Sequence, residues 1–152
     1  IIIKNNLRLE RKKNMKYTFN HEGKEYTLTE ENLEYFANDE IAELEGIDPS
    51  KVLELLNNNK EIEFENAYYE EACSNCNNGK EEKKKVFDFL EFYFYVYGKK
   101  NNYITSSIDD DYEGKSFTKL KRARIVDKSY LTTVMVCKHC GTYAIEIEEI
   151  EL

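Results

Sequence analysis

The chain has 152 residues, of which 41% are hydrophobic and 34% are charged, and this length suits a single domain with one core. Its formal net charge of −8 disfavours binding to duplex nucleic acid or to an anionic membrane surface, because both are negatively charged. The longest apolar run, residues 92–97, is far shorter than the ~20 residues that a membrane-spanning helix requires, so we expect no membrane partner.

Residues 1–14 differ in composition from the rest of the chain. They contain five basic residues and one acid, and the first methionine is Met15. The apolar run at residues 1–3 precedes the charges and is too short for a secretory signal. We therefore expect residues 1–14 to be a disordered extension or a segment that the natural protein lacks, and residues 15–152 to form one cytoplasmic domain. Without the +4 of the first fourteen residues, the remaining chain carries −12.

A β-hairpin and two short helices are expected at the start of this domain. Residues 16–28 alternate apolar and polar side chains on either side of a turn that contains Gly23. Residues 29–37 then carry an apolar stripe at helical spacing, with acids in the first turn where they favour the helix dipole. A second short helix is expected over residues 39–45, ending at Gly46.

The third predicted helix has the clearest signals. Asp48 suits the N-cap and Pro49 suits the first helical position, and apolar residues follow at helical spacing up to residue 56. From residue 61 onward the apolar period changes to two, which predicts strands rather than helices.

The second half of the chain predicts an antiparallel sheet. Residues 86–97 fit either a helical stripe or a strand, but seven of these twelve residues are aromatic, which favours a strand. Residues 103–108 would return beside it, and an acidic loop would follow at residues 109–114. Three further strands are expected, at residues 116–126, 130–137 and 142–150. Because helices come first and the sheet follows, the predicted class is α+β.

All four cysteines of the chain fall into two C-x-x-C pairs, Cys73 with Cys76 and Cys137 with Cys140. Two intervening residues let a tight turn direct both sulfurs to one ion. Residues that tolerate a left-handed backbone follow each pair, Asn-Asn-Gly after the first and Gly141 after the second. Four thiolates would complete a closed tetrahedral shell, which is the structural form of a zinc site. The spacing therefore predicts one structural zinc ion.

Other interpretations of the cysteines remain open at this point. A thioredoxin-like redox pair requires a helix directly after the first cysteine, whereas the second pair lies between two predicted strands. Disulfides would require an oxidising compartment, of which the sequence gives no sign. Iron could occupy the same four sulfurs. His139 lies inside the second pair, where its ring would point away from the ion, so we expect a surface role for it.

The strand–turn–strand arrangement around residues 137–141, with a second pair upstream, resembles a zinc ribbon. Sixty residues separate the pairs, which is more than a minimal ribbon contains and implies an elaborated or inserted sheet. The full chain also resembles a functionally uncharacterised family of short proteins from low-GC Gram-positive bacteria that carry two such pairs. This resemblance implies zinc binding and supplies no activity.

Residues 115–138 are basic, with seven basic residues and one acid, in contrast to the acidic first half of the chain. On the predicted strand, Lys119 and Lys121 would share one face, and Arg122 and Arg124 the other. Together with nearby tyrosines they could form a stacking surface for single-stranded nucleic acid. The net charge favours the alternative that these residues balance the acidic half or protect an edge strand.

The sequence favours a binding protein over an enzyme. It contains no Gly-rich phosphate loop, nucleophile elbow or His-Glu-x-x-His helix, and a four-thiolate zinc has no open position for a substrate. We therefore predict a non-enzymatic, zinc-stabilised domain that presents a surface to a macromolecular partner, with a protein as the favoured partner. The alternatives are an RNA or single-stranded DNA accessory module, and a thiol-based redox sensor that releases zinc on oxidation.

Overall fold

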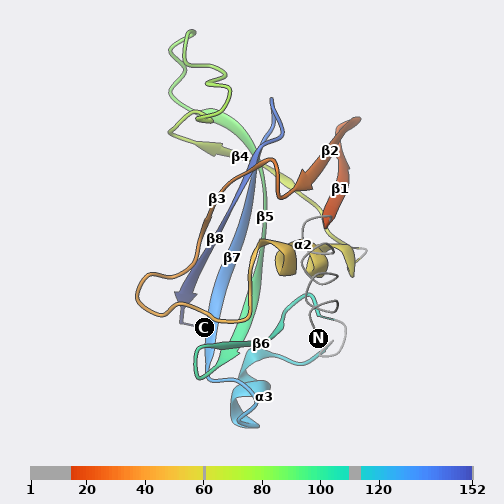
Figure 1. Cartoon of the computed structure of the whole chain (residues 1–152), viewed down its shortest axis with the longest axis vertical. Helices are drawn as coiled ribbons and strands as arrows, with labels where there is room; N and C mark the ends of the chain where they lie inside the picture. The colour runs from red at the N-terminus through yellow and green to blue at the C-terminus, as the bar shows by residue number, and fades with distance from the viewer. Residues whose placement is uncertain (1–14, 60, 110–113, 152) are drawn as a thin grey trace, which may run out of the picture.

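The computed structural model describes residues 15–59, 61–109 and 114–151. Within these ranges the chain forms a six-stranded mixed sheet and a separate two-stranded hairpin (Figure 1). The order across the sheet is β3 (Leu33–Ala37), β8 (Tyr143–Ile150), β7 (Lys128–Cys137), β5 (Phe87–Lys99) and β4 (Glu65–Tyr69), and β6 (Asn102–Ser106) also pairs with β5. The fold is α+β, as predicted. In the part of the chain that the structure describes, no helix has the length and apolar character needed to cross a membrane.

The centre of the sheet is the antiparallel arrangement of β5, β7 and β8. The aromatic strand β5 pairs with β7 from Phe89 opposite Cys137 to Gly98 opposite Lys128. This confirms the strand predicted for residues 86–97 and excludes a helix there. The strand forms because β4, β6 and β7 supply hydrogen-bond partners along both of its edges.

The predicted N-terminal hairpin is confirmed by β1 (Lys16–His21) and β2 (Lys24–Thr29). A two-residue turn joins them, and both Glu22 and Gly23 have positive φ angles, of 49° and 82°. Tight antiparallel hairpins favour this backbone geometry because it matches the twist of the two strands.

The third predicted helix is also confirmed, as α2 (Pro49–Asn57). The carboxylate of Asp48 accepts a hydrogen bond of 2.8 Å from the N–H of Lys51, which caps the helix. The hairpin and α2 cover one face of the sheet (Figure 1). Their buried side chains join those of the sheet in one core, which includes Phe19, Leu28, Leu53, Leu56, Phe94, Val134 and Ile145.

The helix predicted for residues 29–37 is wrong. Residues 33–37 form β3, which pairs in parallel with β8 at the edge of the sheet. The side-chain oxygen of Asn32 accepts hydrogen bonds from the N–H and the hydroxyl of Thr29, at 2.8 and 3.1 Å, and holds the chain in a turn. Short helices nucleate poorly, and pairing with β8 satisfies the backbone of this segment instead.

The helix predicted for residues 39–45 is wrong as well. One carboxylate oxygen of Asp39 accepts hydrogen bonds from the N–H groups of Ile41 and Ala42, at 2.9 and 2.8 Å. The other accepts a bond of 2.9 Å from the N–H of Glu149 at the end of β8. These three backbone donors, that of Glu149 first, lower the pKa of the Asp39 carboxyl. Such side-chain bonds compete with helical backbone bonds, and here they fix an irregular turn.

The strand predicted for residues 116–126 is wrong, because α3 (Phe117–Arg122) lies there. The hydroxyl of Ser116 accepts a hydrogen bond of 3.2 Å from the N–H of Lys119 and caps the helix. Apolar residues three apart, Phe117 and Leu120, then give the helix one apolar side.

The end of α3 has a Schellman geometry. Arg124 has a positive φ of 61°, and the N–H of Ile125 donates to the carbonyl of Leu120 at 3.0 Å. Leu120 packs with Tyr97 and Val126 in a small cluster at the end of β5, apart from the main core. The acidic loop expected at residues 109–114 falls largely on residues 110–113, outside the described ranges.

The two faces of the sheet differ in burial. On the face toward α2, Leu90 and Val134 are fully buried. On the opposite face, Tyr93 is 54% exposed, and Leu131 and Met135 are partly exposed. Among the described elements, α2 and the hairpin both lie on the buried side (Figure 1).

This difference predicts the cost of two matched substitutions. Leu90→Ala should lower the free energy of unfolding by about 2–5 kcal/mol, because it opens a cavity at a fully buried position. Leu131→Ala makes the same change on the opposite face and should cost less than Leu90→Ala, because this side chain is already partly exposed and leaves a smaller cavity. Denaturant unfolding of both variants measures the two values. Equal losses would show that both faces are buried, contrary to this structure.

Candidate metal centre

The two cysteine pairs sit on turns with the same backbone geometry. In each pair the residue after the second cysteine has a positive φ, 53° at Asn77 and 82° at Gly141. Its N–H donates to the carbonyl of the first cysteine, at 2.7 Å for Cys73 and 2.9 Å for Cys137. The left-handed residue reverses the chain and leaves both sulfurs of the pair on the same side of the turn.

The fold brings the four sulfurs of Cys73, Cys76, Cys137 and Cys140 together, all within 4.8 Å of one another. The closest approaches join the two pairs, with 3.6 Å between the sulfurs of Cys73 and Cys140 and 3.7 Å between those of Cys76 and Cys137. All four are free thiols. Four sulfurs at ~2.3 Å from a central ion would be about 3.8 Å apart in a tetrahedron, so the spacing fits a metal ion.

Polar groups next to the sulfurs complete the cluster. The hydroxyl of Thr142 lies 3.1 Å from the sulfur of Cys140 and 3.4 Å from that of Cys73. The amide of Asn75 lies 3.6 Å from the Cys140 sulfur. These groups can donate hydrogen bonds to thiolates and thereby orient them around an ion.

The thiols of Cys76, Cys137 and Cys140 differ in how readily they ionise. Burial raises the pKa of the thiols of Cys76 and Cys137. Burial also opposes ionisation of Cys140, but hydrogen bonds from Thr142 and Asn75 outweigh it and lower the pKa of this exposed thiol to about 6. A cation at the centre would offset the cost of ionising the buried thiols, so metal binding and proton release are coupled here.

The basic residues that sequence analysis singled out are not brought to this cluster. Lys119, Lys121, Arg122 and Arg124 are exposed on α3 and just after it. That segment precedes β7, whereas the second cysteine pair begins at the last residue of β7, so the length of this strand separates them (Figure 1). The predicted arrangement, with the two lysines on one strand face and the two arginines on the other, does not occur, because the segment forms α3. His139 is exposed within its turn, as expected.

The family described as "Protein of unknown function (DUF3785)" matches residues 17–152, which include both cysteine pairs and the whole sheet. The chain belongs to this family. The expectation of an uncharacterised family is thereby confirmed. No curated protein and no solved structure matches the chain.

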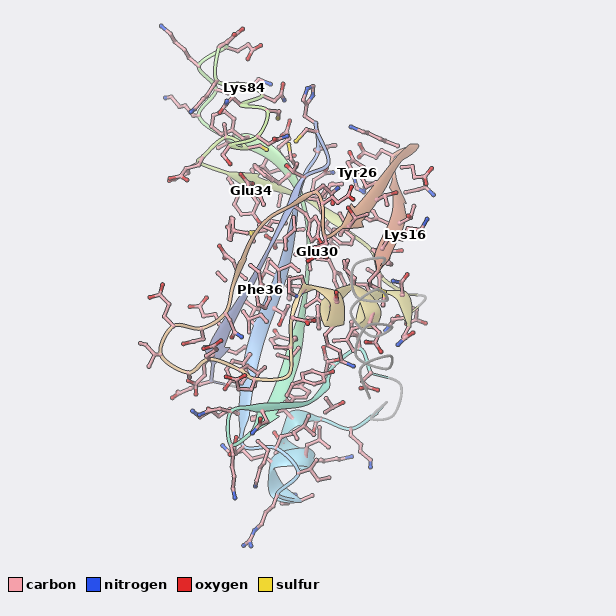
Figure 2. All side chains as sticks on the ribbon, in the orientation of Figure 1. Lys16, Tyr26, Glu30, Glu34, Phe36 and Lys84 are labelled. Carbon is pink, nitrogen blue, oxygen red and sulfur yellow. The ribbon has the colours of Figure 1, made fainter. Side chains whose placement is uncertain are left out.

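In this DUF3785 chain, residues that sequence analysis did not single out hold the second cysteine turn in place. The hydroxyl of Tyr26 donates to the carbonyl of Lys138 at 2.8 Å. The ammonium of Lys24 donates to the carbonyls of Lys138 and His139, at 3.1 and 2.9 Å. Figure 2 shows Tyr26 on β2 directed toward this turn at the end of β7. The hairpin therefore supports the cysteine turn from the side.

Three further contacts tie the same turn to distant segments. The ammonium of Lys138 lies 3.3 Å from a carboxylate oxygen of Glu22 and 2.8 Å from the side-chain oxygen of Asn66. The hydrogen bond from Lys138 is the main cause of the lowered pKa of the Glu22 carboxyl. The side-chain amide of Asn32 donates to the carbonyl of Gly141 at 3.3 Å. No local sequence pattern indicates these contacts, because the partners are far apart along the chain.

The left-handed residues after the cysteine pairs give a matched test of this geometry. Gly141→Ala should destabilise the protein by about 1–2 kcal/mol, because an alanine at a φ of 82° is strained even where space is open. Asn77→Gly should be neutral or slightly stabilising at the equivalent position, since glycine adopts a φ of 53° without strain. Thermal and denaturant unfolding compare the two variants. A neutral Gly141→Ala would mean that the second turn does not have this backbone conformation.

Proposed function

We propose that this protein is a non-enzymatic domain whose four cysteines bind one structural zinc ion, and that the domain presents a surface to a partner protein. The observation that carries the proposal is the convergence of four free thiols within 4.8 Å from two turns of the same geometry.

Zinc is the metal that the donor set favours. Four sulfur ligands from two C-x-x-C turns form the usual closed shell of structural zinc, and such a shell leaves no position for a substrate. The turn between β7 and β8 carries one pair on a β-hairpin, which supports the likeness to a zinc ribbon. The first pair lies between β4 and β5, and the elements between the pairs would be the inserted part of the sheet.

A protein partner in the cytoplasm fits the chemistry of the surface. Free cysteines persist in reducing compartments, where they serve as metal ligands more often than as disulfides. The net charge of −8 opposes binding to nucleic acid and to anionic lipid. The partly exposed sheet face, with Tyr93, Leu131 and Met135, offers an aromatic and apolar area of the kind found at protein interfaces.

The metal gives the central prediction. Purified, dialysed protein should retain about one zinc ion per chain by elemental analysis. Cys137→Ser should lose the metal, because three thiolates beside an open position hold the ion weakly, and its unfolding midpoint should fall. Ser74→Ala is the control, since it changes the first cysteine turn without removing a sulfur. Stoichiometric iron, or a metal-free protein with full stability, would contradict the proposal.

Hydrogen exchange shows which strands lose stability when the metal is removed. Chelation should reduce the protection of β7 and β8 next to the second pair, at residues such as Val134 and Ile145, because binding energy at a site absent from the unfolded chain stabilises the fold. Unchanged protection in these strands would show that the metal is not structural.

A redox sensor is the second candidate, and one observation favours it. Cys140 is exposed and its pKa is lowered to about 6, which gives it the thiolate character and the access that oxidants require. Reversible zinc release with peroxide, with Cys140 as the first of the four cysteines to be oxidised by peptide mass spectrometry, would support sensing over a purely structural role.

A nucleic-acid function depends on the basic residues of α3. We expect the chain from Met15 to bind duplex DNA weakly or not at all at physiological salt, because its net charge of −12 repels phosphate. Fluorescence anisotropy with a labelled duplex and a labelled single strand measures this. Sub-micromolar affinity that falls steeply with added salt, and that is lost when Lys119 and Arg122 are replaced by glutamine, would favour the nucleic-acid module instead.

A further inference from the structure

A cleft of about 660 Å³ lies on the partly exposed face of the sheet, beside the first cysteine pair. The register of the strands shows which residues form the floor of this cleft. Tyr35 on β3, Ala144 on β8 and Met135 on β7 line the cleft, and they are successive partners across the sheet, so they share one face. Ala144 has a small side chain, so the floor formed by Ala144 and the partly exposed Met135 is recessed relative to the larger residues around it.

Aromatic rings form the sides of this cleft. Tyr35 stands at the β3 edge, and Tyr69 of β4 packs edge-on against Phe89 of β5 with ring centroids 5.0 Å apart. Tyr68, which also lines the cleft, is 64% exposed. Ring faces of this kind attract cations through their quadrupole.

The tyrosine hydroxyls are anchored to carboxylates. Tyr35 donates to Glu146 at 2.8 Å, and Tyr69 donates to Glu91. Burial and the bond to Glu146 raise the pKa of Tyr35 to about 12, so this tyrosine stays a neutral donor. The bonds fix the ring orientations, and the carboxylate of Glu146 lies in the cleft lining.

All the charged residues that line the cleft are acidic. Glu34, Glu70, Glu71 and Glu146 line the cleft, and no lysine, arginine or histidine is among the described residues that line it. Lysines line only the adjoining hollow beyond Glu70 and Glu71, at Lys80, Lys84 and Lys85. In Figure 2, Glu34 lies on the side of β8 away from the hairpin. Carboxylates beside aromatic rings in a partly enclosed space complement a positively charged organic group.

We infer that this cleft binds an arginine or lysine side chain within an extended basic segment of a partner protein. The inference rests on the proposed function and names the surface and the partner chemistry. A chain segment fits better than a free cation, because the aromatic area continues beyond the cleft. Tyr93 lies in the next row of the same face, opposite Thr133, and contacts Tyr95 edge-on at 6.4 Å.

Synthetic peptides test this binding directly on the zinc-loaded full chain. The first probe is a fluorescein-labelled peptide of alternating glycine and arginine. The second is the same peptide with every arginine replaced by citrulline, which keeps the shape and removes the charge. Anisotropy at physiological ionic strength should show saturable binding of the arginine peptide and none of the citrulline peptide. Equal binding of the two would overturn the inference.

Charge-removing variants then locate the site. Glu71→Gln combined with Glu146→Gln should weaken arginine-peptide binding by about tenfold or more, since both carboxylates line the cleft. Glu148→Gln is the matched control, because it removes a charge from the same strand and face outside the cleft lining, and it should change affinity less than about twofold. Equal losses in the two cases would mean diffuse charge attraction, and the site would be rejected.

Two further measurements exclude other occupants. Displacement of the peptide by free arginine amide at the peptide's own dissociation constant would assign the cleft to a small cation and overturn the peptide proposal. If sedimentation shows that the chain dimerises and that the dimer does not bind the peptide, the face belongs to a second copy of the chain, and the peptide proposal is overturned as well. Zinc content and unfolding midpoint are measured in every variant. Failure of peptide binding with zinc and stability intact rejects this inference alone, whereas loss of zinc in the unaltered protein rejects the proposed function.

Discussion

The meeting of two cysteine turns at one end of the sheet is the constraint on which the rest of the structure depends. Cys73 and Cys140 are 67 residues apart in sequence, yet their sulfurs lie 3.6 Å from each other. The intervening chain must therefore leave the cluster and return, and it does so as β5, β6, α3 and β7. Closing such a long loop costs chain entropy that grows only slowly with length. An ion held by both turns would stabilise the folded state against that cost.

The same end of the sheet also gathers the N-terminal part of the chain. The hairpin reaches the second cysteine turn through Tyr26 and Lys24, and Asn32 reaches it from the start of β3. These contacts satisfy backbone carbonyls that a tight turn leaves without partners in the sheet. The opposite end relies on apolar packing of Leu120 and Val126 against Tyr97. One end of the sheet is thus held by polar contacts around the sulfurs and the other by a small apolar cluster, and three long strands join the two ends.

One face of the sheet is buried and the other is accessible, because side chains alternate between the two faces along each strand. On β5, Leu90 and Phe94 point into the core, and Phe89 and Tyr93 point to the other side. Only the first set is covered by α2 and the hairpin. The second set remains accessible together with carboxylates from β3, from the segment after β4 and from β8, which gives this face the combination of aromatic area and negative charge that suits a basic partner.

Residue spacing alone determined several features of this protein. The two C-x-x-C pairs predicted one sulfur cluster, Asp48 with Pro49 predicted the start of α2, and the aromatic run predicted β5, because each depends on neighbours within a few residues. Tertiary contacts determined the secondary structure of residues 33–37 and 116–126. Leu33–Ala37 is a strand only because β8 lies beside it, and Phe117–Arg122 is a helix whose apolar side rests on Tyr97. Short segments have too little local stability to fix their own conformation, so contacts with distant residues choose it.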